Sequence, residues 1–153
     1  TIKKLGKIDC LINNAALFEK DDILNFTNKS WNDHLNINLL APAILIKHFA
    51  KQASKKVSSN IINIIDQRVF KLTPHFLSYT LSKTGLHTLT KIIALEGGSG
   101  ITCNVIAPGI INTATNRSQM PDTNHGNWVN PGKIAKKIEE LLLSDENGSL
   151  IGF

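Results

Sequence analysis

Residues 60–66, Asn60-Ile61-Ile62-Asn63-Ile64-Ile65-Asp66, form a run typical of a β-strand buried inside a sheet. Two other apolar runs have the same character, Ile8-Asp9-Cys10-Leu11-Ile12 and Ile101-Thr102-Cys103-Asn104-Val105-Ile106-Ala107. Helical stretches of roughly twenty residues separate the three runs. Strands that alternate with helices are joined by right-handed crossovers, which makes the sheet parallel. The sequence therefore predicts an α/β fold with a parallel sheet.

Each predicted strand stops at polar or flexible residues. The first is followed by Asn13-Asn14-Ala15-Ala16, the second ends at Asp66, and the third is followed by Pro108-Gly109. The carboxyl ends of parallel strands lie at one edge of the sheet, and ligands of open α/β sheets bind outside that edge. We therefore expect these three stops to border one crevice.

A tyrosine and a lysine follow the second strand. Tyr79 stands thirteen residues after Asp66, and Lys83 is four residues beyond Tyr79. Side chains four apart on a helix share a face, so the ammonium is expected to lie near the phenol and to lower its pKa. A phenol shifted toward neutral pH is a useful proton donor. The alternative is an ordinary surface pair.

Taken together, these motifs resemble those of the short-chain dehydrogenase/reductase family. Asn13-Asn14-Ala15-Ala16 is similar to the family's Asn-Asn-Ala-Gly turn, Asn38 to its helix asparagine, and Tyr79 with Lys83 to its catalytic pair. Residues 108–113, Pro108-Gly109-Ile110-Ile111-Asn112-Thr113, resemble the Pro-Gly turn whose later residues bind the nicotinamide carboxamide. The resemblance covers nearly the whole chain.

The resemblance implies a Rossmann-like, doubly wound parallel sheet and hydride transfer between NADP, or NAD, and a small-molecule substrate. It implies that Tyr79 is the acid, that Lys83 lowers its pKa and holds the nicotinamide ribose, and that Asn38 supports a proton-relay water. The cofactor-binding residues that it implies are Asn14, Ala15, Ala16, Tyr79, Lys83, Pro108, Gly109, Ile111 and Thr113.

Asp66 departs from the family pattern, which usually has serine thirteen residues before the tyrosine. An aspartate there resembles the pteridine reductase branch, and Phe18, four residues after Asn14, falls where that branch stacks an aromatic ring on the pterin. A carboxyl group can exchange hydrogen bonds with the amino and ring nitrogens of a pterin. Asp66 and Phe18 are therefore the predicted substrate residues, and Asp66 joins Asn38, Tyr79 and Lys83 as catalytic.

Other interpretations stay open. Asp66 is also suited to capping the turn that follows it, and Phe18 to a core or lid position. The stretch Asn116-Arg117-Ser118-Gln119-Met120-Pro121, with Trp128 and Gly148-Ser149-Leu150-Ile151, resembles dihydropteridine reductases. The runners-up for function are a general carbonyl reductase or alcohol dehydrogenase of the same family, and a non-catalytic dimerising fragment of a split gene.

The family's glycine-rich phosphate turn has no counterpart in this sequence. The cluster Gly97-Gly98-Ser99-Gly100 follows a predicted helix and precedes a strand, which is typical of a helix stop. We therefore expect residues 1–153 to be the C-terminal part of a single NAD(P)-binding Rossmann domain, truncated to its second half. The adenine and pyrophosphate part of the cofactor site would then lie outside the chain.

The remaining segments are predicted from periodicity and breakers. We expect a helix over Trp31–Ser54, with Asn38 beside its buried stripe and a kink at Pro42. A second helix, Pro74–Glu96, is apolar on a broad face, which suits packing either against a second subunit or within the core alone; the resemblance implies a homodimer or homotetramer. For the C-terminal part of the chain, we expect a substrate lid at residues 112–130, a helix over Pro131–Leu143 and a last strand in 148–153.

Composition narrows the function classes. With 153 residues, 42% of them hydrophobic and 19% charged, the chain fits one globular domain. The net charge of +5 comes from scattered lysines such as Lys3-Lys4, Lys55-Lys56 and Lys136-Lys137, which argues against a nucleic-acid site. The five histidines lack the spacing of metal ligands, and no apolar run is long enough to span a membrane. We expect a cytoplasmic protein, without bound metal, whose Cys10 and Cys103 are buried free thiols.

Overall fold

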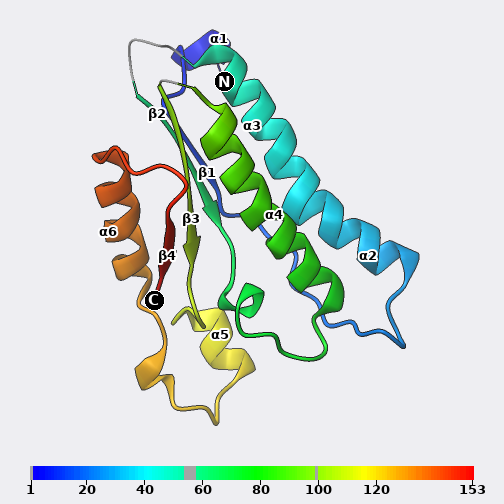
Figure 1. The fold of residues 1–153 in the computed structure, drawn as a ribbon. Coiled ribbons are helices and arrows are strands. Elements are labelled where there is room, and N and C mark those ends of the chain that lie inside the picture. Colours follow the sequence, from blue (N-terminus) through cyan, green and yellow to red (C-terminus); the bar gives the residue numbers. More distant parts are fainter. Residues whose placement is uncertain (1, 54–57, 99) are drawn as a thin grey trace.

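A computed structural model describes residues 2–53, 58–98 and 100–153. Its centre is a four-stranded sheet in the order β1-β2-β3-β4, with every neighbouring pair parallel. The strands are β1 (Cys10–Asn13), β2 (Ser59–Ile64), β3 (Ile101–Ala107) and β4 (Leu150–Gly152). The parallel α/β fold and the final strand are therefore confirmed (Figure 1).

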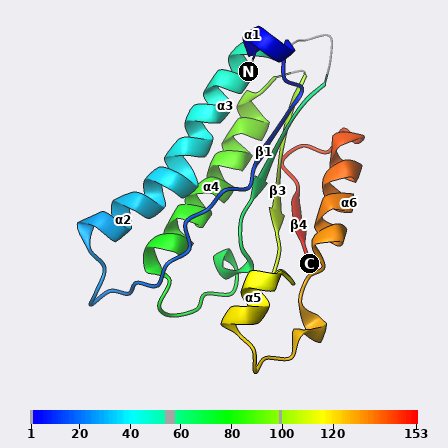
Figure 2. The same ribbon diagram turned by 180° about the vertical axis from the view of Figure 1, so that it is seen from behind.

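Helices cover both faces of this sheet. The helices are α1 (Ile2–Leu5), α2 (Asn28–Leu35), α3 (Ala41–Gln52), α4 (Leu77–Glu96), α5 (Ala114–Gln119) and α6 (Pro131–Leu142). Figures 1 and 2 show α2, α3 and α4 on one face, α6 on the other, and α5 beyond the carboxyl ends of the strands. This arrangement is doubly wound, as the resemblance implies, and α5 is placed over the edge where ligands bind in such sheets.

The isoleucines of β2 are buried because helices pack on both sides of it. Successive side chains of a strand point to opposite faces, so Ile62 packs toward Ile134 and Leu141 of α6, whereas Ile61 packs toward Ile46 of α3. All six residues of β2 are buried. A strand in this position needs apolar residues on both faces, which explains why it has no alternating pattern.

The predicted long helix is divided by a wider turn. Instead of one helix over Trp31–Ser54, the structure has α2, a π-helical turn at Asn36–Leu40, and α3; Ser54 lies outside the described residues. Pro42 has no N–H to give to the carbonyl of Asn38 four residues earlier, and its ring crowds that carbonyl. The irregularity that we predicted at Pro42 is confirmed, but it takes the form of a π-turn around Asn38.

The segment predicted as a lid contains regular structure. Thr113 caps α5 by accepting a hydrogen bond from the backbone N–H of Asn116, and a second short turn occupies His125–Asn127. Residues 112–130 are therefore not a continuous irregular loop, and their role as a substrate lid stays a prediction. Gly98 has φ of +63°, which supports the predicted helix stop; Ser99 lies outside the described residues.

Within the three described stretches, no helix combines the length and the apolarity needed to cross a bilayer. A cytoplasmic location stays a prediction. Cys103 is buried in β3 and Cys10 is partly buried in β1, and burial raises the pKa of both thiols. The pair Lys55-Lys56 lies outside the described residues.

Candidate active site

A cavity of about 520 Å³ lies at the carboxyl ends of the strands. Asn14 follows β1, residues 64–66 end β2, and residues 108–111 follow β3; all border the cavity. Tyr79 and Lys83 reach it from α4, and Gln119 and Met120 from α5 and its C-terminus. The structure thus brings the three strand stops to one crevice, as the sequence predicts.

Tyr79 and Asp66 are in direct contact at the end of β2. The phenol of Tyr79 donates to Oδ2 of Asp66 at 3.1 Å, and Tyr79 is only 5% exposed. Asp66 also caps the short turn after β2, because its Oδ1 accepts from the backbone N–H of Arg68 at 2.8 Å. The turn-capping interpretation and the Tyr79 contact therefore hold together, since each uses a different carboxylate oxygen.

Lys83 lies deeper than its tyrosine neighbour. Its Nζ donates to the backbone carbonyl of Ile64 at 2.9 Å and stands 6.0 Å from the centre of the Tyr79 ring. The residue is 2% exposed. Burial lowers the pKa of Lys83 to about 8, and the nearby Asp66 carboxylate opposes that shift.

The expected lowering of the Tyr79 pKa was wrong. Burial raises the pKa of Tyr79, and the Asp66 carboxylate raises it further by charge and by accepting the hydrogen bond. The contact made by the phenol is with a carboxylate, whereas the Lys83 ammonium is bonded to the Ile64 carbonyl. Tyr79 is therefore held in its protonated form, which is the form that a proton donor needs.

Arg68 is a site residue that our sequence reasoning missed. Its Nη1 donates to Oδ2 of Asp66 at 3.0 Å, and its guanidinium carbon lies 4.7 Å from the ring centre of Phe76 and 5.1 Å from that of Phe18. The signal in the sequence was a cation two residues after Asp66, where a turn brings side chains together. Its charge partly offsets the effect of Asp66 on the Tyr79 pKa.

Aromatic rings form the wall opposite the strand ends. Phe18 stacks on Phe76 with ring centres 4.7 Å apart and planes 7° from parallel, and it meets Tyr79 edge-on at 4.7 Å. Phe18 is still 49% exposed. Phe18 thus lies beside Tyr79, and its role in stacking on a substrate stays a prediction; Phe76, three residues before Tyr79, was missed.

Asn38 connects the π-turn to α4 and to the loop after β1. Its Nδ2 donates to the carbonyl of Leu17 at 2.9 Å and to Oγ of Ser82 at 3.0 Å, and its Oδ1 accepts from the N–H of Leu17 at 2.8 Å. The side chain is fully buried. Both amide protons are used, so a relay water would bind the backbone carbonyl that Pro42 leaves without its usual donor; that role stays a prediction.

Most of the predicted cofactor residues border the cavity. These are Asn14, Ala16, Tyr79, Lys83, Pro108, Gly109 and Ile111. Ala15 stands between two lining residues, Asn14 and Ala16, without lining the cavity itself, and Thr113 does not line it but caps α5. Their roles in cofactor binding stay predictions.

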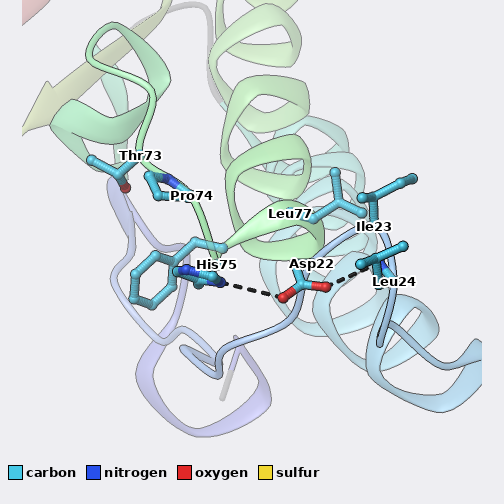
Figure 3. Close-up of a pocket in the computed structure, with 8 residues that line it drawn as sticks. Asp22, Ile23, Leu24, Thr73, Pro74, His75 and Leu77 are labelled. Atoms are coloured by element: carbon cyan, nitrogen blue, oxygen red, sulfur yellow. Dashed lines mark hydrogen bonds and ion pairs between the residues drawn. The ribbon is translucent and has the colours of Figure 1, made fainter.

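A second, smaller cavity of about 430 Å³ lies beside the first, with Phe76 in the wall of both. Its charged groups are paired: Nδ1 of His75 lies 3.3 Å from Oδ2 of Asp22, and Oδ1 of Asp22 accepts from the N–H of Leu24 (Figure 3). Ile23, Leu24, Pro74 and Leu77 make the rest of its wall apolar. In the part of the chain described, no group of three or more potential metal ligands gathers here or elsewhere.

Residues 1–124 match the family model described as short chain dehydrogenase. The chain belongs to the short-chain dehydrogenase family. A relative from this family, the 2-dehydro-3-deoxy-D-gluconate 5-dehydrogenase of Escherichia coli strain K12, is 36% identical over 124 residues, which are 78% of this chain and 47% of that protein. The chain spans about half the length of the curated relatives it matches.

Two solved short-chain dehydrogenases share the fold closely. FolM, the alternative dihydrofolate reductase 1 of Brucella canis in complex with NADP, superposes with a TM-score of 0.87 at 30% identity, covering 99% of this chain and 63% of that one. A 4-hydroxyisoleucine dehydrogenase complexed with NADH has a TM-score of 0.84 at 30% identity, with 99% and 69% covered. The nearby structures of this family thus contain either nicotinamide cofactor.

Proposed function

We propose that the protein is an NAD(P)H-dependent reductase in which Tyr79 is the proton donor. The observation that carries this proposal is the buried hydrogen bond of 3.1 Å between the Tyr79 phenol and Asp66, beside Lys83, at the carboxyl ends of a parallel sheet. The complexes of related structures with NADP and NADH support the cofactor class.

The cavity residues fit the nicotinamide end of such a cofactor. To described residues, Nζ of Lys83 donates only to the Ile64 carbonyl, so it retains donors for ribose hydroxyls. Gly109 borders the cavity, and a Cβ on it would stand only 3.2 Å from Oε1 of Gln67, so a side chain at this position would crowd that neighbour. Bound there, a reduced nicotinamide would supply a hydride.

Tyr79 supplies the other half of the reduction. A carbonyl oxygen, or an imine nitrogen, that hydrogen-bonds to the phenol takes its proton as the neighbouring carbon receives the hydride, and solvent then returns a proton to Tyr79. The phenol is in its acid form at neutral pH, as a proton donor must be, although the raised pKa makes it a weaker acid than an unshifted phenol. The same shift leaves little phenolate at neutral pH, and phenolate is the form that would act as the base in the reverse oxidation.

A pteridine is the first substrate class that we propose. Phe18 is half exposed next to Tyr79, where an aromatic ring system can stack on it, and Asp66 places a carboxylate beside the proton donor. The similarity to FolM of Brucella canis supports this choice.

A small carbonyl compound is the second substrate class. The observation that favours it is that Asp66 is already occupied by Arg68 and Tyr79, which leaves less of the carboxylate to receive the amino group of a pterin. Similarity to a sugar-acid dehydrogenase of Escherichia coli supports it as well.

The two classes are separated by an assay of NADPH and NADH oxidation with dihydrobiopterin, dihydrofolate and a panel of ketones and aldehydes. If a pteridine is the substrate, Asp66→Ala is expected to abolish its reduction. Turnover of ketones alone would reject the pteridine proposal. The assay uses both the 153-residue chain and a form with a glycine-rich phosphate-binding segment added at its N-terminus, because phosphate contacts contribute much of dinucleotide affinity. Absence of turnover in both forms would favour a non-catalytic dimerising protein.

We also propose a homodimer or homotetramer. Exposed apolar side chains follow α2, the π-turn and α3, among them Ile37, Leu40, Ile44 and Leu45, which are 42–51% exposed, and Leu81 and Ile92 lie exposed on α4. Adjacent exposed apolar helix faces are typical of subunit contacts. Light scattering during gel filtration is expected to give two or four times the chain mass of 16.8 kDa, and a monomer would reject the proposal.

A further inference from the structure

Arg68 uses only one side of its guanidinium group in this structure. Nη1 donates to Asp66, at 3.0 Å to Oδ2 and 3.3 Å to Oδ1. Nε is buried and has no partner among the described residues, and Nη2 makes no hydrogen bond to them. Because Nε has almost no accessible surface, Nη2 is the nitrogen that can offer N–H groups to a ligand carboxylate.

The Asp66 carboxylate, in contrast, can accept few further hydrogen bonds. Oδ1 accepts from the backbone N–H and Nη1 of Arg68, and Oδ2 accepts from Nη1 and from the Tyr79 phenol. A carboxylate has about four lone-pair positions, so a further donor from a substrate would have to displace one of these. The polar group that this side of the cavity can offer a substrate is therefore the Arg68 cation.

The Arg68 guanidinium lies close to Tyr79. Tyr79 Oη and Arg68 Nη1 donate to the same oxygen at 3.1 and 3.0 Å, so they are separated by at most the sum of those distances, about 6 Å. Lys20, whose side chain is exposed, also borders this part of the cavity. In the neighbouring cavity, His75 faces Asp22 (Figure 3).

We propose that Arg68 determines substrate specificity by binding a carboxylate, and that the substrate class is a 2- or 3-oxo acid. Such acids place the carboxylate one or two carbons from the reacting carbonyl, which suits the short separation of Tyr79 and Arg68. The keto carbon takes the hydride, the keto oxygen takes the Tyr79 proton, and the carboxylate keeps its charge on Arg68. This inference rests on the proposed reductase function and deepens its second substrate class, the small carbonyl compound, in place of a pteridine.

The test compares acids with their uncharged amides: acetoacetate with acetoacetamide, and benzoylformate with its amide. We expect wild-type kcat/KM to favour the acid by about tenfold or more, as befits a charge-assisted pair worth ~1.4 kcal/mol or more. Arg68→Gln is expected to reduce this preference to about one, chiefly through KM. Arg68→Lys keeps the charge without the planar guanidinium group, and its preference for the acid is expected to lie between those of the wild type and Arg68→Gln. Arg117→Gln, which removes an exposed arginine outside the cavity wall, is the matched control.

The ratio separates specificity from positioning, because Arg68 also holds Asp66. A variant that loses acid and amide turnover equally would show that Arg68 acts only through Asp66, and this would overturn the proposal. Equal use of acid and amide by the wild type would also overturn it. A thermal shift with each probe serves as a readout without turnover. Stabilisation by the acids alone, lost in Arg68→Gln, would support the carboxylate site even if the protein reduced nothing, and that result would count against the reductase function only.

Discussion

Tyr79→Phe is expected to lower kcat for reduction by about 10²–10⁴-fold while leaving the fold unchanged. The substitution removes one hydroxyl, whose hydrogen bond is to Asp66, and Arg68 still pairs with that carboxylate. The ring contacts with Phe18 are retained in the variant. Steady-state rates and thermal unfolding measure the two effects. Thr84→Val, which removes an exposed hydroxyl from the same helix, is the matched control and is expected to retain full activity.

The same residue permits a test that does not need turnover. Tyr79 is the single tyrosine of the chain, so the ultraviolet signal of phenolate formation reports on it alone. Since its pKa is raised in the folded state, we expect the native protein to resist ionisation above pH 10, and Asp66→Asn to lower the titration midpoint. By linkage, the stability contributed by the protonated phenol is fully present below pH ~10 and is lost as pH rises further. A midpoint below 10 in the native protein would contradict the burial and the Asp66 contact.

The fold was largely predictable because its signals are local. The apolar runs at Cys10–Asn13, Ser59–Ile64 and Ile101–Ala107 needed only to be recognised as strands, and parallel crossovers then brought their ends together. The helix Pro131–Leu142 was found within one residue of its end, since an apolar stripe and a proline at its start define it. These features depend on periodicity and chain direction alone.

The details of the site depended on side-chain directions that spacing does not give. A separation of four residues placed Tyr79 and Lys83 on one face of α4, but it did not show that Lys83 would bond to the Ile64 carbonyl and Tyr79 to Asp66. The sign of the Tyr79 pKa shift followed first from the burial of the phenol and then from its contact with Asp66. Arg68 was missed for the same reason, since its partners Phe18 and Phe76 are distant in sequence.

The helix α5 was not predicted from the sequence, for a different reason. Thr113 is an N-cap residue, and its signal was present in the sequence, but the six residues of α5 are rich in Asn, Thr and Ser, which have low helix propensity. Capping and contacts near the strand ends outweigh that propensity in the folded chain. A short, polar helix in a long connection is consequently among the elements that composition predicts least well.

Lys83→Met is expected to abolish activity and yet to stabilise the protein at pH 7. Burial lowers the pKa of Lys83 from 10.5 to about 8, which corresponds to a cost of the order of 3 kcal/mol for keeping the ammonium charged inside the fold. The variant also loses the hydrogen bond to the Ile64 carbonyl, which lowers its stability by about 1 kcal/mol and offsets part of that gain. We therefore expect the free energy of unfolding in urea to rise by about 2 kcal/mol. Lys91→Met, an exposed lysine of the same helix, is the control and should change it little.

The stability difference between Lys83→Met and the wild type is expected to depend on pH. The folded state binds its proton more weakly than the unfolded state, so the wild type gains stability from this group as pH rises from about 8 toward 10.5. The advantage of Lys83→Met should therefore shrink by pH 10, when Lys83 of the wild type is neutral. Reduction by the wild type should decline above pH 8 as the cation that holds the ribose is lost. A Lys83→Met protein that is less stable than the wild type at pH 7 would contradict this prediction, and so would a stability advantage that grows with pH. Either result would mean that Lys83 carries its charge at no cost. The assignment of Lys83 as a buried cation that is retained for its function would then fail.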